Sequence, residues 1–250
     1  MNIRLAQLLV SKNIDENREK IFNTVSTSER NDFVIFPEGM LSGYYPEEPE
    51  FLQSLDKEKI NMSVKEIKEK VVQKGVSCIF GTAYYDTNWY NSAVFINTNG
   101  DIRVYHKNNL STLDREYFHQ GSILNVMAEE KVIFGIQMCR ELVFPEQWKV
   151  LKKKGAQVVF HINNAIKEKD RKWRHLLFTR AFENQYFVCS INNPASSQAL
   201  PSFVISPTGE VLFESEMRKE QIIRIEIDIK EALLTYLKQE REDLVTLKYR

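Results

Sequence analysis

The first eighty residues alternate between short apolar runs and amphipathic stretches, and this alternation constrains the fold more than any other feature. Apolar runs at 3–10, 33–36 and 76–80 are typical of buried strands. Between them, residues 15–27 and 56–74 carry apolar side chains at helical spacing. This strand–helix–strand–helix–strand order predicts a layered α/β domain with helices packed outside a sheet.

The rest of the chain is richer in strands. Asn99-Gly100 and Pro207-Thr208-Gly209 each separate two apolar runs, and such pairs predict hairpins. No linker, repeat or break in composition divides the sequence, so we expect one domain over residues 1–250 with two sheets. The expected strands are 92–97, 102–106, 132–138, 157–162, 186–191, 203–206, 211–213 and 222–229, the expected helices are 145–154 and 173–183, and a charged helical tail is expected to close the chain.

The composition excludes several classes of function. Lys and Arg number 34 and so do Asp and Glu, which gives no overall attraction to nucleic acid or to an anionic membrane. The longest apolar runs fall far short of the ~20 residues that span a bilayer. The three cysteines, Cys78, Cys139 and Cys189, are odd in number and widely spaced, so we expect free thiols and a cytoplasmic location.

Cys139 has the position of a nucleophile. It follows the apolar strand expected at 132–138 and precedes a turn into a helix. A strand-to-helix turn exposes a side chain at the carboxyl end of a sheet, and its backbone N–H groups can stabilise an oxyanion. A small buried apolar residue is the alternative, and it is favoured for Cys78 and Cys189, which lie inside strand patterns.

Two further candidates also follow expected strands. Glu38 comes directly after Phe36-Pro37 and begins a loop rich in Gly and Tyr, where partial desolvation raises a carboxyl pKa and suits a general base. Lys107 ends the run at 102–106 and enters a polar loop, where an ammonium group could stabilise developing negative charge. The four histidines have no spacing typical of a metal site.

Glu38, Lys107 and Cys139, in this order and each at a strand end, resemble the nitrilase superfamily of carbon–nitrogen hydrolases. Nearly the whole chain takes part in the resemblance. The motifs that carry it are Phe36-Pro37-Glu38 with Gly43-Tyr44, Tyr105-His106-Lys107-Asn108-Asn109-Leu110, the segment 135–146 around Cys139, the segments 151–156 and 180–188, and Ser206-Pro207-Thr208-Gly209-Glu210-Val211-Leu212.

This resemblance implies a four-layer αββα sandwich of two mixed sheets with outer helices. It implies that Cys139 is the nucleophile, Glu38 the general base and Lys107 the oxyanion stabiliser. Many members carry a second glutamate that orients the lysine, and we assign that role to Glu116, with Asp114 as the alternative. The backbone N–H of Arg140 is expected to complete the oxyanion hole.

Substrate contacts are expected from Tyr44, Arg140 and Asn163. The neighbours of Cys139 depart from the usual family pattern, since Arg140 and Val143 stand where an aromatic residue and an arginine are common. We expect the Arg140 guanidinium either to bind a substrate carboxylate or to pair with Glu141, Glu146 or another nearby acidic residue.

The resulting interpretation is an amidase that cleaves a small non-peptide C–N bond through a cysteine thioester and releases ammonia or an amine, without a metal or organic cofactor. An N-carbamoyl amide hydrolase is the nearest alternative, and a catalytically silent binding protein on the same fold is an alternative of a different class. We expect no nucleic-acid or membrane partner. The resemblance also implies a homodimer or larger assembly, to which Phe144, Trp148, Leu233, Leu234 and Tyr236 could contribute apolar surface.

Overall fold

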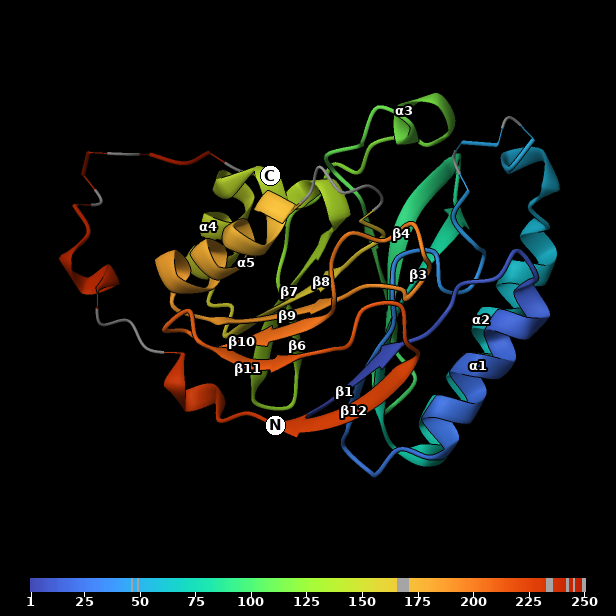
Figure 1. Ribbon diagram of the computed structural model, residues 1–250, viewed down its shortest axis with the longest axis horizontal. Helices are drawn as coiled ribbons and strands as arrows, with labels where there is room; N and C mark the ends of the chain where they lie inside the picture. Colours follow the sequence, from blue (N-terminus) through green and yellow to red (C-terminus); the bar gives the residue numbers. More distant parts are fainter. Residues whose placement is uncertain are drawn as a thin grey trace.

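Two six-stranded sheets lie face to face between two layers of helices in the computed structural model (Figure 1). This arrangement confirms the predicted αββα sandwich. The structure describes residues 1–45, 47–48, 50–165, 171–232, 236–241, 243–244 and 246–248.

The first sheet is built mainly from the N-terminal part of the chain. Helices α1 (Ile14–Ser26) and α2 (Lys57–Lys74) cover its outer face. Asp56 caps the start of α2 by accepting from the Lys59 N–H at 2.9 Å, and Gly75 ends it in the left-handed conformation with φ of 64°. In spatial order the strands are β12 (Gln221–Glu226), β1 (Asn2–Gln7), β2 (Phe33–Ile35), β3 (Ser77–Tyr85), β4 (Trp89–Ile96) and β5 (Ile102–His106).

The second sheet is built from the C-terminal part, and helices α4 (Pro145–Lys153) and α5 (Arg171–Asn184) lie on its outer face (Figure 1). The short helix α3 (Asp114–Tyr117) lies apart from both helix layers, in the loop after β5. In spatial order the strands are β11 (Val211–Glu214), β10 (Phe203–Ile205), β9 (Phe187–Ile191), β8 (Val158–Ile162), β7 (Val132–Met138) and β6 (Met127–Glu129).

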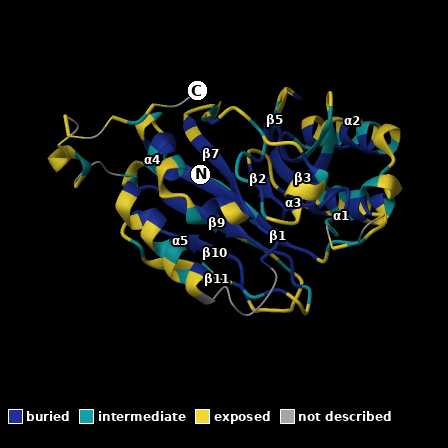
Figure 2. Cartoon of the chain, turned by 90° about the horizontal axis from the view of Figure 1, so that it is seen from above, coloured by how far each residue is buried: buried dark blue, intermediate teal, exposed yellow. Residues whose placement is uncertain are grey.

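An aromatic core holds the two sheets together. The Phe33 ring stacks on that of Phe160 across the sheets, with centroids 5.9 Å apart, and the Phe95 ring meets that of Phe134 edge-on at 5.0 Å. Alternation along each strand sends the neighbouring apolar residues to the helix side, where Val34 packs in a second core with α1 and α2. The burial colouring of Figure 2 shows the result, with buried strands inside and exposed outer faces on the helices.

The strand topology brings the ends of distant strands together. Strands β1, β2 and β3 are parallel, and β5 runs in the same direction because β4 is antiparallel to both β3 and β5. Strands β7, β8 and β9 are parallel in the second sheet. The segments that follow β2, β5 and β7 carry Glu38, Lys107 and Cys139, so the predicted strand-end positions of these residues are confirmed.

The C-terminal tail differs from the prediction. Its described residues beyond β12 contain only the short 3-10 turns Ile229–Glu231 and Leu237–Gln239, so the expected helical tail is wrong there. A short helix is marginal in water unless one face packs against the protein. This segment touches the helix layer at separate points, such as the Tyr236 ring on Phe182 and the Lys149–Glu240 ion pair.

The apolar residues expected to contact a second copy of the chain do not all lie at the surface. Trp148 is fully buried and donates its indole N–H to the Glu141 carbonyl at 3.0 Å, so it belongs to the core. Phe144 and Tyr236 are exposed, whereas Leu233 and Leu234 lie outside the described residues. The homodimer or larger assembly stays a prediction. Among the helices of the described chain, none is long and apolar enough to cross a membrane.

Candidate active site

Glu38 is fixed by the strand beside it. The Gly81 N–H donates to the Pro37 carbonyl at 3.1 Å, and the Leu41 N–H donates to the Gly81 carbonyl at 3.0 Å. A Cβ atom on Gly81 would lie 2.5 Å from the Glu38 Cα, so only glycine allows this close approach of the two backbones. The Glu38 carboxylate is therefore held, fully buried, just beyond the carboxyl end of β2 in the first sheet.

Lys107 joins two buried carboxylates. Its backbone N–H donates to the Asn91 carbonyl at 2.9 Å, which continues the β4–β5 pairing by one residue. Its Nζ lies 2.9 Å from Glu38 Oε1 and 2.7 Å from Asp114 Oδ2, and all three side chains have no solvent exposure. Asn91 Nδ2 donates to Glu38 Oε1 at 2.8 Å and to Asp114 Oδ1 at 3.2 Å, which locks the carboxylates in place.

The structure corrects the assignment of the second acidic residue. Asp114, not Glu116, is the carboxylate that contacts Lys107, and Glu116 is exposed. Asp114 is the first residue of α3, and two helical positions turn the side chain by about 200°. Glu116 therefore points away from the lysine. Tyr44 completes the Asp114 environment by donating its hydroxyl to Oδ1 at 2.6 Å.

The pKa values of the three ionisable groups in the cluster are shifted in different directions. Burial alone would raise the pKa of Asp114, but the Lys107 ammonium lowers it to about 2. Burial alone would lower the pKa of Lys107, and the Asp114 and Glu38 carboxylates raise it well above its usual value. Burial raises the pKa of Glu38 despite its contact with Lys107. Asp114 and Lys107 thus form the permanent ion pair, and Glu38 is the carboxyl group that can take up and release a proton.

Cys139 sits on a strained turn at the end of β7. Its φ of 41° lies in the left-handed region that few non-glycine residues adopt, as expected for a side chain lifted out of a strand-to-helix turn. The Cys139 carbonyl accepts from His161 Nε2 at 3.1 Å, and the thiol approaches the Asn164 carbonyl at 3.7 Å. Burial raises the pKa of the thiol, and the Glu38 charge raises it further, so the resting cysteine is protonated.

Glu141 links the lysine loop to the cysteine turn. Its Oε1 accepts from the Asn108 N–H at 2.8 Å and from the Asn109 N–H at 3.1 Å, directly after Lys107. Its Oε2 accepts from the Met138 N–H at 2.8 Å, directly before Cys139. From the sequence, Glu141 is expected only as one of the acidic residues that could pair with Arg140. Its position two residues after Cys139 is the only sequence feature that points to a role at the site. The hydrogen bonds that it makes to the segments beside Lys107 and Cys139 depend on how the two sheets pack, which the sequence does not determine.

The three expected substrate contacts have different outcomes. Tyr44 lines the small pocket that Glu38 also lines. Arg140 is exposed, and its guanidinium lies over the Trp173 ring, 5.3 Å from the centroid, with neither Glu141 nor Glu146 as an ion-pair partner. Asn163 is fully buried and is not among the lining residues, whereas Asn164 is. Side chains alternate along β8 and its continuation, so the shift from one asparagine to the next changes the side of the sheet.

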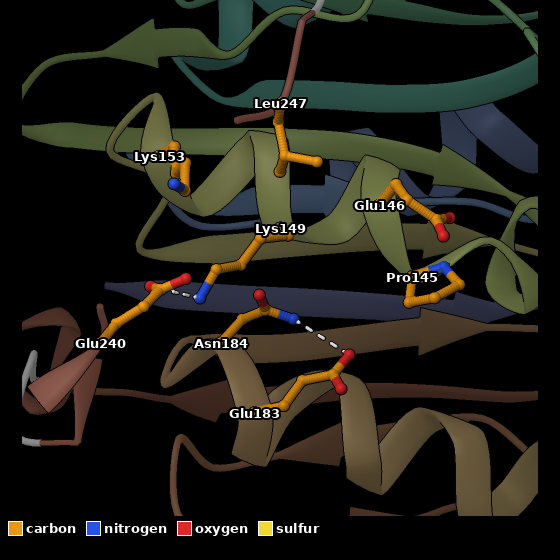
Figure 3. Close-up of a pocket in the computed structure, with 8 residues that line it drawn as sticks. All are labelled: Pro145, Glu146, Lys149, Lys153, Glu183, Asn184, Glu240 and Leu247. Atoms are coloured by element: carbon orange, nitrogen blue, oxygen red, sulfur yellow. Dashed lines mark hydrogen bonds and ion pairs between the residues drawn. The ribbon is translucent and has the colours of Figure 1, made fainter. Parts of the chain in front are cut away.

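The pocket over the cluster is small. It has a volume of about 60 Å³, and residues from the loops after β2, β8 and β9 line it. A larger hollow of about 290 Å³ lies between α4, α5 and the C-terminal segment, where Lys149 pairs with Glu240 at 2.8 Å (Figure 3). The two share no lining residue, and only the smaller one reaches Glu38. Within the described parts of the chain, no group of three or more His, Cys, Asp or Glu residues could hold a metal ion.

A carbon–nitrogen hydrolase family model matches residues 3–235 of the sequence. The chain belongs to this family. A 2-oxoglutaramate amidase of Bacillus subtilis is 30% identical over 214 residues, which cover 82% of this chain and 81% of that protein. A glutamine-dependent NAD(+) synthetase of Aquifex aeolicus is 28% identical over 100% of this chain but only 45% of the synthetase, so the chain spans less than half of that relative.

Solved structures of the nitrilase superfamily have the same fold as this carbon–nitrogen hydrolase. An amidase of Nesterenkonia superposes with a TM-score of 0.84 at 17% identity, over 98% of this chain and 95% of that one. A nitrilase-superfamily protein of Saccharomyces cerevisiae superposes with a TM-score of 0.82 at 19% identity, over 97% and 94% of the two chains.

Replacing the two acidic residues one at a time separates Asp114 from Glu116. Asp114→Asn removes one charge from a buried pair, so we expect a loss of about 3–5 kcal/mol in the free energy of unfolding. We also expect a fall of about 10- to 100-fold in hydrolytic kcat/KM, because the ammonium group loses its anchor. Glu116→Gln, at an exposed position, should change both quantities little. Thermal unfolding and steady-state kinetics check this, and equal effects of the two variants would contradict the assignment.

Proposed function

We propose that this hydrolase cleaves a small, non-peptide amide through a thioester on Cys139 and releases ammonia or an amine. The observation that carries the proposal is the buried Asp114–Lys107–Glu38 cluster, whose charges act on the Cys139 thiol. Glu38 Oε2 is buried with no hydrogen-bond partner, so one oxygen of the proposed base is free for proton transfer. A catalytically silent protein has no need of this costly arrangement of buried charges.

The chemistry follows from these parts. Ionised Glu38 takes the thiol proton, and the thiolate attacks the amide carbonyl carbon. The Lys107 ammonium and the Arg140 backbone N–H stabilise the oxyanion. Protonated Glu38 then gives its proton to the leaving nitrogen, which leaves an acyl group on Cys139. In the second half, Glu38 activates water, and its attack on the thioester releases a carboxylate and the free thiol.

Relatives support the proposed reaction class. Similar proteins include a formamidase of Bradyrhizobium, 23% identical over 91% of this chain and 70% of its own, besides the 2-oxoglutaramate amidase. For one variant of the Nesterenkonia amidase, the structure is described as showing covalent addition of the acetamide moiety of fluoroacetamide at the active-site cysteine. We propose the same use of the nucleophile for Cys139.

Removal of the thiol tests the proposal. Cys139→Ala should abolish amide hydrolysis, because alanine cannot form the thioester, while the melting temperature stays close to that of the parent. Cys189→Ala is the control, since Cys189 is also a buried free cysteine but lies within β9. An ammonia-release assay over a panel of small amides, N-carbamoyl compounds and nitriles gives the readout. Undiminished turnover by Cys139→Ala would remove Cys139 from the mechanism.

The raised pKa of Glu38 sets the expected pH dependence. Only the ionised carboxylate can accept the thiol proton, so kcat/KM should fall as the pH drops through the pKa of Glu38. Because burial raises this pKa, the acid limb should have its midpoint above about 4.3, the usual value for glutamate. The Asp114 charge also raises it, so the limb should move to lower pH in Asp114→Asn. A profile that stays flat down to pH ~4 contradicts this role for Glu38.

A further inference from the structure

Three carboxamide side chains gather at the small pocket that Glu38 lines, and neither the mechanism nor the sequence motifs account for them. They belong to Asn164, after β8, and to Asn193 and Gln198, between β9 and β10. Their exposed fractions are 7%, 5% and 5%, so each is more than nine-tenths buried. Buried carboxamides without saturated hydrogen bonds are costly, and such groups point to a ligand.

A backbone N–H fixes the orientation of all three groups. The Ala195 N–H donates to Asn193 Oδ1 at 2.9 Å, so the Asn193 NH₂ group faces the other way. That NH₂ donates to Asn164 Oδ1 at 2.7 Å, and Gln198 Nε2 donates to the same oxygen at 2.7 Å. Turning any one amide by 180° would place two donors or two acceptors against each other. The chain of bonds therefore has a single consistent arrangement.

This arrangement leaves one acceptor and one donor unused. Gln198 Oε1 is buried and has no hydrogen-bond partner. Asn164 Nδ2 donates to no acceptor among the described residues, since the amide is engaged only through Oδ1. Both residues line the pocket. A ligand that supplies an N–H or O–H donor to Gln198 and an acceptor to Asn164 would satisfy both.

The charges around the pocket argue against an anionic ligand. Its described lining includes the carboxyl groups of Glu38 and Glu47 and no Lys, Arg or His side chain. Lys12, which lies over the Tyr45 ring, is paired with Glu48. Arg140, the expected carboxylate ligand, lies over Trp173 instead. A carboxylate on the substrate would therefore approach two acidic side chains in a pocket whose described lining offers no cation to pair with it.

We propose that the substrate carries, on its acyl side, a second neutral polar group with both a donor and an acceptor, such as a carboxamide or a ureido group, which binds Gln198 and Asn164. This inference rests on the proposed amide hydrolysis and names its substrate class. The pocket has a volume of only about 60 Å³, so the group is small.

Binding to the Cys139→Ala variant tests the inference without turnover. Three ligands of matched shape are succinamide, the anionic succinamate and the apolar 4-methylpentanamide. Titration calorimetry should show succinamide binding at least about tenfold more tightly than either of the others, because a site built for hydrogen bonds rejects ligands that leave its polar groups unpaired. Tighter or equal binding of succinamate or 4-methylpentanamide, or no binding of any of the three, overturns the inference.

A second substitution tests whether Gln198 causes the preference for succinamide. In the Cys139→Ala background, Gln198→Met removes the acceptor at similar side-chain volume and should reduce the preference for succinamide over 4-methylpentanamide at least about fivefold. Gln73→Met, at an exposed position on α2, is the matched control and should leave the preference unchanged. An unchanged preference in a folded Gln198→Met variant also overturns the inference. Failure of the parent protein to hydrolyse any amide would instead reject the proposed function, whatever the binding results.

Discussion

The Lys107 ammonium between two carboxylates is the interaction on which the candidate site depends. Three ionisable side chains without solvent exposure are tolerable only when their charges compensate and their hydrogen bonds are satisfied. Asp114 balances the charge of Lys107 permanently. Glu38 can therefore be ionised at rest and become neutral when it takes the thiol proton, so the net charge of the three buried groups changes by only one unit during the reaction.

The fold holds this cluster against the nucleophile by joining the two sheets at one edge. Glu38 and Lys107 follow strands of the first sheet, and Cys139 follows a strand of the second. Glu141 fixes the distance between them, because its two oxygens bind the backbone beside Lys107 and the backbone beside Cys139. The aromatic core between the sheets also fixes their separation over a wider area, since the rings of Phe33 and Phe160 pack directly on each other. Small sheet movements are thereby resisted at the point where the reacting groups meet.

Local patterns in the sequence predict a layered α/β domain and the strand-end positions of Glu38, Lys107 and Cys139, and the family resemblance adds the αββα sandwich. Apolar runs define the strands, and a polar residue directly after a run is placed at the sheet edge whatever the rest of the chain does. The errors come from rotations that these patterns do not determine. Asp114 and Glu116 are two residues apart on a short helix, and Asn163 and Asn164 are neighbours directly after β8, where only Asn164 lines the pocket. In each pair the choice depends on a packing angle, and the carboxamide cluster with Asn193 and Gln198 depends on contacts between distant loops.

The most direct measurement is the mass of Cys139-containing peptides from enzyme quenched in acid while it turns over a small amide. Acid protects a thioester and stops its hydrolysis, so the intermediate can be detected. If Cys139 forms the thioester, the peptide that contains it gains the mass of the acyl group, and the peptides that contain Cys78 and Cys189 do not. Steady release of ammonia with no acyl group on Cys139 at any quench time would contradict it.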